Sequence, residues 1–114
     1  MHNPRWKPPE LFASNALYTA ASDVYCFGVI MWELVGRAVP FAELVWPSLV
    51  EDRILSGARP AVPPDVRPDY AKLLRRCWAQ APEERPGSLE LLGSVEALRS
   101  LDYLPPPQNM AAPI

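Results

Sequence analysis

The amino-acid sequence predicts an all-α fold. Three segments show helical patterns of apolar residues, at 24–35, 70–78 and 88–98, and prolines and glycines separate them. Between these segments, no alternation of apolar and polar residues is long enough to predict a β-strand. With 114 residues, 49% of them hydrophobic, the chain has enough core material for one small domain.

The composition excludes several classes of function. The net charge is -2 and lysine and arginine are scattered, so we expect no nucleic-acid or anionic-membrane partner. A single histidine, His2, leaves too few ligands for a zinc site, and we expect no metal. Cys26 and Cys77 lie within apolar helical patterns, where a free thiol behaves as a small hydrophobe. This usage indicates a reduced, cytoplasmic setting, and residues 1–14 show no signal peptide.

The N-terminal residues 1–13 are expected to be extended or turned. Pro4, Pro8 and Pro9 break any continuous helix there. Residues 14–21 are small and polar, which predicts a loop that leads to Ser22 as the N-cap of the next helix.

Residues 24–35 predict a buried helix. Ten of these twelve residues are apolar, so the helix has no polar face. It is too short to span a bilayer, which needs about 20 residues, and we expect it to be buried in protein. Gly36 is expected at the C′ position after its end. For Glu33, the one charge within it, we expect a satisfied polar contact.

A second helix is expected from Pro47 to about Ser56, closed by Gly57. Its expected inward residues are Leu49, Val50 and Ile54, and its expected outward residues are Glu51, Asp52 and Arg53. Residues 57–69 contain four prolines and form a stiff connector. A proline-rich peptide ligand is the alternative reading of that segment.

Two further helices follow the connector. Tyr70, Leu73, Leu74, Cys77 and Trp78 stand at helical spacing, so one face packs and the opposite face is solvated. The last helix is expected to begin near Ser88. Its expected apolar stripe consists of Leu91, Leu92, Val95 and Leu98. Residues 102–114 are rich in proline and lack a pattern, which predicts a disordered tail.

Four motifs, taken in order, resemble the protein kinase family, specifically its tyrosine-kinase-like branch. Residues 6–10, Trp-Lys-Pro-Pro-Glu, are similar to the Ala-Pro-Glu element, with Pro8 where alanine is usual. Residues 23–28, Asp-Val-Tyr-Cys-Phe-Gly, resemble the family's Asp-Val-Trp-Ser-Phe-Gly. Residues 36–41 resemble its glycine-x-x-x-proline-phenylalanine loop, and Cys77-Trp78 with Glu84-Arg85-Pro86 resembles its Cys-Trp and Arg-Pro close. The resemblance covers residues 4 to about 100.

The resemblance implies the organisation of the chain. Residues 1–13 would be the end of the activation segment, and residues 14–101 the helical C-terminal subdomain of the large lobe. Glu10 and Arg85 would form a structural ion pair, and a carboxylate and a guanidinium suit this role because two parallel hydrogen bonds fix their geometry. Asp23 would anchor the backbone of the catalytic loop.

The resemblance also implies roles for six aromatic, basic and proline residues. Phe27, Trp32 and Trp78 would lie in the core of the lobe. Trp6, Lys7 and Pro8 would border the groove for the peptide substrate. Read without the family, Trp6 is equally a surface aromatic residue in an N-terminal strand.

The sequence lacks the residues that catalyse phosphoryl transfer. It has no glycine-rich loop, no His-Arg-Asp and no Asp-Phe-Gly. We therefore expect no catalytic, cofactor or metal residue in this chain and no activity from it alone. A full-length parent would use ATP and Mg²⁺ to phosphorylate serine, threonine or tyrosine of protein substrates. The alternative is a catalytically dead, kinase-like interaction module that binds a protein partner or self-associates through an uncovered apolar face.

Overall fold

The computed structural model describes residues 3–102, which contain four α-helices, three short 3-10 turns and no strand. The prediction of an all-α fold is confirmed. The helices are α1 (Ala20–Gly36), α2 (Pro47–Leu55), α3 (Pro68–Cys77) and α4 (Ser88–Asp102). The 3-10 turns are η1 (Pro4–Trp6), η2 (Pro9–Phe12) and η3 (Pro82–Glu84). Asp102, where the disordered tail was expected to begin, ends α4, and residues 103–114 lie outside the described residues.

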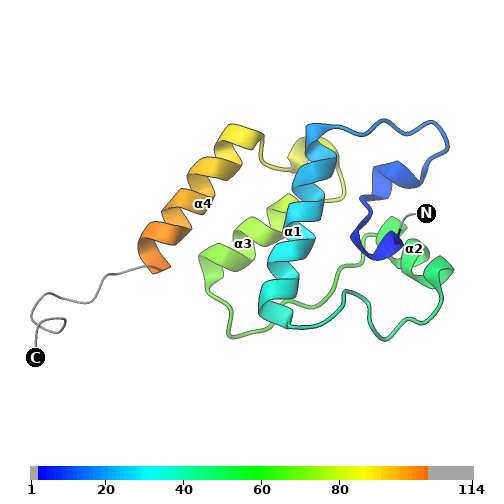
Figure 1. Ribbon diagram of the computed structural model, residues 1–114, viewed down its shortest axis with the longest axis horizontal. Coiled ribbons are helices and arrows are strands. Elements are labelled where there is room, and N and C mark those ends of the chain that lie inside the picture. Colours follow the sequence, from blue (N-terminus) through cyan, green and yellow to red (C-terminus); the bar gives the residue numbers. More distant parts are fainter. Residues whose placement is uncertain (1–2, 103–114) are drawn as a thin grey trace, which may run out of the picture.

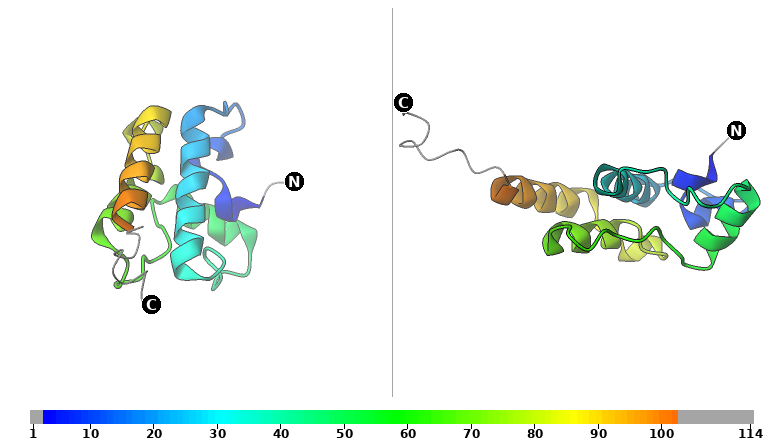
Figure 2. Two further views of the ribbon diagram at one scale, coloured as in Figure 1. Left: turned by 60° about the vertical axis from the view of Figure 1, so that its left-hand side comes forward. Right: turned by 90° about the horizontal axis from the view of Figure 1, so that it is seen from below.

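The helices lie in two layers. Seen from below, α1 and α4 lie in one layer and α3 lies in the other (Figure 2). The short helix α2 and the N-terminal turns gather at one end of the molecule, and α4 lies at the opposite end (Figure 1). The central helix α1 therefore separates the two ends.

Helix α1 begins earlier than the sequence indicates. Its N-cap is Thr19, so the expectation that Ser22 caps the helix is wrong. Ser22 lies one turn into the helix, where its Oγ accepts a hydrogen bond from the Thr19 backbone N–H at 3.1 Å. The hydroxyl thus caps the helix from within its first turn, as the third residue of a capping box does.

The end of α1 also differs from the expectation. Gly36 is the last helical residue, and Arg37 takes the left-handed conformation with φ 52° and ψ 41°. Gly36 is small for another reason, because a Cβ at this position would lie 2.8 Å from the ring of Trp32. The glycine makes room for the indole, whose Nε1 donates to the Ala61 carbonyl at 2.8 Å.

Helices α1 and α3 approach each other closely at Gly28. A Cβ on Gly28 would lie 2.8 Å from the Cβ of Cys77 and 3.3 Å from the Leu74 carbonyl oxygen. The two helices pack there with backbone against side chain, and Tyr70 adds a hydrogen bond from its hydroxyl to the Met31 carbonyl at 2.8 Å. Around this contact lies the main core, which consists of Val24, Tyr25, Val29, Met31, Trp32, Leu73, Leu74, Cys77, Trp78 and Leu98.

A second, smaller core supports α2. Phe41, Leu44, Val50 and Ile54 are buried together, with Phe12 of η2 against them. Leu49 is exposed, contrary to the expectation that it faces inward. Since α2 has only 9 residues, two buried positions one turn apart complete its inner face. None of the helices within residues 3–102 is long and apolar enough to cross a membrane.

We predict that Gly28→Ala lowers the free energy of unfolding by about 1–3 kcal/mol, because the added methyl group must push α1 and α3 apart. Gly93→Ala is the matched control, since nothing lies within 4 Å of a Cβ there and α4 gains a better helix former. We expect it to stabilise the chain by about 0.5–1 kcal/mol. Urea denaturation followed by circular dichroism measures both changes. Equal effects of the two substitutions would refute the close packing at Gly28.

Candidate functional site

The side chain of Arg85 joins two segments that lie 75 residues apart in the sequence. Its Nη1 donates to Glu10 Oε2 at 2.9 Å and its Nη2 donates to Glu10 Oε1 at 2.8 Å. The structure thus brings together the two residues that the sequence analysis paired, in the bidentate geometry of a guanidinium and a carboxylate. The Arg85 side chain is fully buried, whereas that of Glu10 keeps 22% of its exposure.

Every N–H of Arg85 has an acceptor. In addition to Glu10, the guanidinium donates to the carbonyls of Ala79 at 2.9 Å, Ala21 at 2.9 Å and Gln80 at 3.4 Å. A guanidinium has five N–H donors, and these five bonds use all of them. A buried charge is tolerated when it is paired and fully hydrogen-bonded, so the surroundings of Arg85 stabilise it as a cation.

The carboxylate of Glu10 is stabilised in its charged form. Burial raises its pKa and is the largest single influence, but the hydrogen bonds from Arg85 and Ser22, a backbone N–H and the charge of Arg85 together outweigh it. The pKa of Glu10 therefore lies below its ordinary value of 4.5. The buried Ser22 contributes by donating its hydroxyl to Glu10 Oε2 at 3.2 Å.

The ring of Tyr25 lies between two guanidinium groups. The Cζ atoms of Arg59 and Arg85 stand 5.1 Å and 5.0 Å from its centroid. Such cation–π contacts orient a planar cation over the ring face. Burial raises the pKa of Tyr25 to about 12, although both arginines oppose this change. Tyr25 therefore stays neutral and serves as a packing surface for Arg85.

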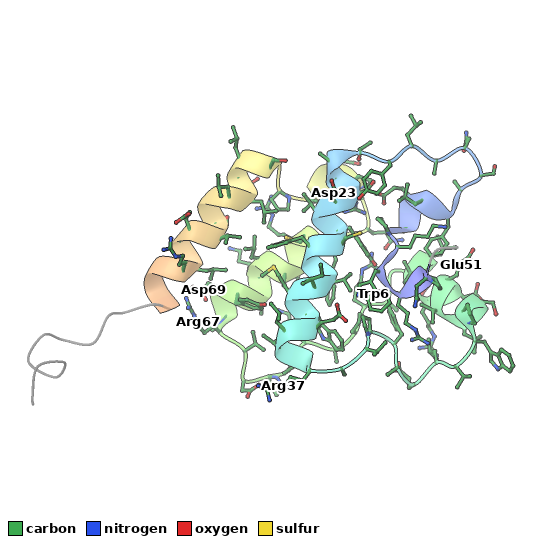
Figure 3. The ribbon with its side chains drawn as sticks, viewed as in Figure 1. Trp6, Asp23, Arg37, Glu51, Arg67 and Asp69 are labelled. Carbon is green, nitrogen blue, oxygen red and sulfur yellow. The ribbon has the colours of Figure 1, made fainter. Side chains whose placement is uncertain are left out.

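Asp23 lies at the exposed beginning of α1 (Figure 3). Its carboxylate accepts a hydrogen bond from the hydroxyl of Tyr18, and this bond is the main reason that the pKa of Tyr18 rises to about 12. The resemblance implies that Asp23 anchors the backbone of the catalytic loop, a segment that these 114 residues do not contain. In the structure, the partner is an exposed tyrosine of the loop before α1.

Trp6, Lys7 and Pro8 lie beside α1 and η2. Trp6 Nε1 donates to Glu33 Oε1 at 2.8 Å, which provides the polar contact expected for Glu33. The ammonium of Lys7 lies 4.7 Å from the ring centroid of Phe12. All three residues line an open cavity of about 520 Å³, together with Leu11, Ala16, Tyr18 and Cys26 among others. Trp6 is thus fixed against α1 and is not a loose surface aromatic.

Arg5 is a site residue that the sequence analysis missed. Its guanidinium donates to the carbonyls of Pro40 at 2.9 Å, Phe41 at 2.6 Å and Leu44 at 2.8 Å. These bonds fasten η1 to the loop that resembles the glycine-x-x-x-proline-phenylalanine motif. No sequence pattern could reveal this contact, because any residue can supply a backbone carbonyl.

Comparison with known proteins identifies the family. The chain matches the protein tyrosine and serine/threonine kinase family over residues 1–95. It belongs to the protein kinases. The resemblance that the four motifs carry is therefore confirmed.

The most similar curated relatives include three proteins of Dictyostelium discoideum. The chain is 43% identical over 99 residues to cyclic GMP-binding protein C, and this match covers 82% of the chain and 4% of that relative. It is 34% identical over 101 residues to the probable serine/threonine-protein kinase roco7, and this match covers 85% of the chain and 4% of that relative. It is 36% identical over 98 residues to the dual specificity protein kinase pyk3, and this match covers 86% of the chain and 7% of that relative. The chain thus spans only a small part of the length of these relatives.

The three expected core aromatics of this kinase segment do not share one environment. Trp32 and Trp78 are buried, whereas Phe27 is 36% exposed within the described residues. Phe27 lies on the side of α1 that faces α4, where α1 and α4 form a groove of about 450 Å³. The groove is lined mainly by apolar side chains, and Leu91, Leu92 and Val95 form its α4 wall. Leu92, expected on the packed stripe of α4, is exposed there.

The cysteines and carboxylates of the kinase segment show no catalytic arrangement. Burial raises the pKa of Cys77 to about 11 and also raises that of Cys26, so both thiols are protonated and weakly nucleophilic at neutral pH. Within the described residues, no three histidine, cysteine, aspartate or glutamate side chains gather as metal ligands. The groups brought together at Arg85 brace the fold and do not form a reactive centre.

We predict that Glu10→Gln lowers the free energy of unfolding by about 3 kcal/mol, because it leaves the buried charge of Arg85 without its counter-ion. The control is Glu90→Gln, which breaks the exposed pair of Glu90 with Arg76 and should change stability far less. Denaturant titrations of both variants measure the difference. A loss for Glu10→Gln no larger than that for Glu90→Gln would contradict the structural role of the buried pair.

The same pair predicts an acid dependence. Because the pKa of Glu10 is lower in the folded chain than in the unfolded chain, its contribution is fully present well above pH 4.5 and is lost as the pH falls through the lowered value. The stability difference between the native chain and Glu10→Gln should therefore be constant between pH 6 and 8 and shrink below about pH 4.5. Denaturant titrations across this range test it. A difference that does not change with pH would contradict the charge pairing.

Proposed function

We propose that this chain forms the C-terminal helical part of the large lobe of a protein kinase, whose full-length parent transfers the γ-phosphate of ATP to serine, threonine or tyrosine of protein substrates. The observation that carries the proposal is the buried pair of Arg85 with Glu10, two residues 75 positions apart in the sequence. Both residues stand in kinase motifs, and the family match spans them.

The task of this segment is to hold the end of the activation segment in place. Residues 1–13 are this end, and residues 14–101 are the helical subdomain that supports it. Arg85 fixes Glu10, and Arg5 fixes η1 to the loop at Pro40 and Phe41. Trp6, Lys7 and Pro8 then border the protein-substrate groove, and the cavity that they line is its floor.

The exposed side of α1 supports the view that more protein covers it in the parent. Phe27, Ile30 and Leu34 are exposed at helical spacing along one side of α1, beside the groove with α4. A contiguous exposed apolar stripe of this kind marks a surface that packs against protein. We assign its cover to the remainder of the kinase domain. Asp23 lies at the beginning of the same helix. In the parent it would accept hydrogen bonds from the backbone of the catalytic loop, and these would replace its present hydrogen bond from the Tyr18 hydroxyl.

ATP and Mg²⁺ belong to the parent in this proposal. Phosphoryl transfer requires phosphate-covering, metal-binding and catalytic residues. In protein kinases Mg²⁺ is held by the aspartate of Asp-Phe-Gly and the asparagine of the catalytic loop, and these 114 residues contain neither motif. We derive no chemical step from this chain, and we place the parent in cytoplasmic signalling, where its substrates are other proteins.

The test is a kinase assay on the native protein that contains this sequence, isolated with an antibody against residues 3–102. We expect transfer of labelled γ-phosphate to a generic protein substrate in the presence of Mg²⁺, and no transfer by the 114-residue chain alone. In the parent, Glu10→Gln should reduce the rate at least tenfold, whereas Glu90→Gln should leave it nearly unchanged. A native protein that neither binds ATP nor transfers phosphate would contradict the proposal and favour a non-catalytic, kinase-like interaction module.

A further inference from the structure

An exposed apolar surface covers the beginning of α2, at the end of the molecule opposite to α4 (Figure 1). We call it the Trp46 patch, and it consists of Val45, Trp46, Pro47 and Leu49. Val45 is 75% exposed, Trp46 66% and Leu49 43%. A single exposed leucine is ordinary, but an exposed tryptophan with three exposed apolar residues within three positions of it in the sequence is a local concentration of apolar surface.

The patch rests on a rigid base. Directly beneath it, Leu44, Val50 and Ile54 belong to the second core. The backbone of Trp46 is held as well, because its carbonyl accepts hydrogen bonds from the N–H groups of Leu49 at 3.0 Å and Val50 at 3.3 Å. Arg5 fixes the loop just before it through the Leu44 carbonyl. An aromatic residue on a fixed backbone loses little conformational entropy on binding, which favours its use as an anchor.

The patch is bordered by carboxylates that have no partner. Glu43 precedes it, and Glu51 and Asp52 follow it on α2. The nearby cations are Arg53, the next residue of α2, and Arg5, whose guanidinium is bound to the carbonyls of Pro40, Phe41 and Leu44. Within the described residues, no ion pair engages these three carboxylates, whereas arginines pair with Asp69 and Glu90 elsewhere. The electrostatic complement of such a surface is an apolar segment that carries positive charge.

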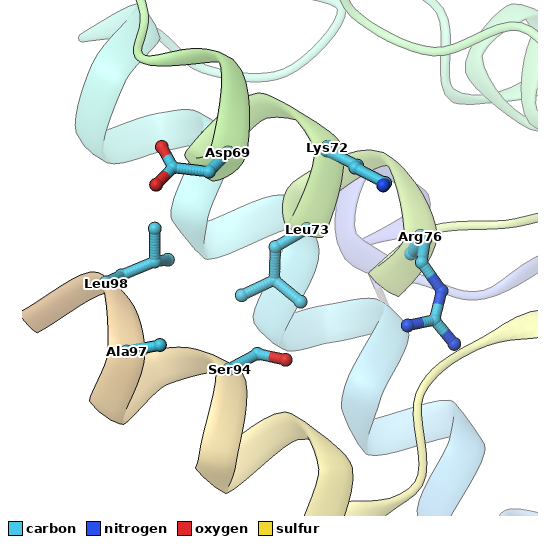
Figure 4. A pocket seen from close by; sticks show the side chains of 7 residues that line it. All are labelled: Asp69, Lys72, Leu73, Arg76, Ser94, Ala97 and Leu98. Atoms are coloured by element: carbon cyan, nitrogen blue, oxygen red, sulfur yellow. The ribbon is translucent and has the colours of Figure 1, made fainter.

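The other hollows of the molecule do not offer such a surface. The cavity between α3 and α4 (Figure 4) has Leu73, Ala97 and Leu98 in its wall and three charged groups, Asp69, Lys72 and Arg76. Asp69 and Arg76 are already paired, with Arg67 and Glu90, and the cavity has no exposed aromatic side chain in its wall. The groove between α1 and α4 belongs to the proposed packing of the kinase domain. The Trp46 patch lies at the opposite end, so its role is independent of the proposed function.

We propose that the Trp46 patch binds a segment of a partner protein in which apolar side chains are flanked by lysine or arginine. Trp46 and Leu49 take up the apolar side chains, and Glu43 and Asp52 pair with the basic ones. A second copy of this chain is a poorer occupant, because a symmetric contact would place the same carboxylates against each other, and like charges repel. Tryptophan is among the residues that contribute most at protein interfaces.

The experiment uses two fluorescein-labelled synthetic peptides of equal length and the 114-residue chain. One peptide is an amphipathic helix of leucine and lysine, and in the other glutamate replaces every lysine. Fluorescence anisotropy at low and high salt gives the dissociation constants. We expect saturable binding of the lysine peptide that weakens with salt, and at least tenfold weaker binding of the glutamate peptide.

Surface variants test whether binding occurs at the patch. Trp46→Ala should weaken binding of the lysine peptide at least tenfold, whereas Leu89→Ser, at the even more exposed beginning of α4, should not. Glu43→Gln with Asp52→Asn should weaken binding severalfold and reduce its salt dependence. The control with the same change in charge is Asp65→Asn with Glu83→Gln, which should have no such effect. Circular dichroism establishes that each variant is folded.

Three results would overturn the proposal. The first is no saturable binding of the lysine peptide. The second is an equal effect of Trp46→Ala and Leu89→Ser, which would place the peptide elsewhere on the acidic chain. The third is sedimentation showing a dimer that Trp46→Ala dissociates, which would make a second copy the occupant.

Discussion

The guanidinium of Arg85 is the point on which the rest of the structure depends. It is buried and charged, so the fold must supply five acceptors in fixed directions. These come from the N-terminal turn at Glu10, from the first turn of α1 at Ala21 and from the segment before η3 at Ala79 and Gln80. One side chain therefore determines where three separate segments meet. The buried ring of Tyr25 packs against it, with the Cζ atom of Arg85 over the ring at 5.0 Å from its centroid.

A second constraint sets the distance between the two long elements that flank this point. Helices α1 and α3 touch at Gly28, where only a hydrogen atom fits against Cys77. Close contact there places Trp32 and Trp78 in one core and keeps the carbonyl of Ala79 within reach of Arg85. Helix packing and the polar network thus reinforce each other. The end of the molecule at α2 has its own small core. Arg5 and the N-terminal turns join it to the rest, and so do Arg59 and Gln80, which donate to the carbonyls of Ile54 and Leu55.

The sequence predicted most of the helices because the buried face of a helix requires apolar residues at helical spacing. The pattern at Leu73, Leu74 and Cys77 marked α3, and proline and glycine marked both ends of α2. Sequence analysis also paired Glu10 with Arg85, but through the family motifs in which they stand and not through any local sequence pattern. Sequence analysis gave the wrong role where a residue is determined by a contact with a residue that is not its immediate neighbour in the sequence. Local rules explain a glycine by its own backbone and a capping serine by the turn that it begins. In this chain the ring of Trp32 leaves no room for a side chain at Gly36. The hydroxyl of Ser22 both caps α1 and donates a hydrogen bond to Glu10.

The separation of Glu10 from Arg85 has a consequence for synthesis of the protein. Glu10 leaves the ribosome first, and at about 5–20 residues per second the next 75 residues take about 4–15 s to follow. In the early part of this interval α1 has been made but α3 and η3 have not, so the surface of α1 that packs against α3 has no native cover. Glu10 can reach its buried partner only after residue 85 has been made, so the N-terminal turn waits for its anchor through most of the synthesis of the helices between them.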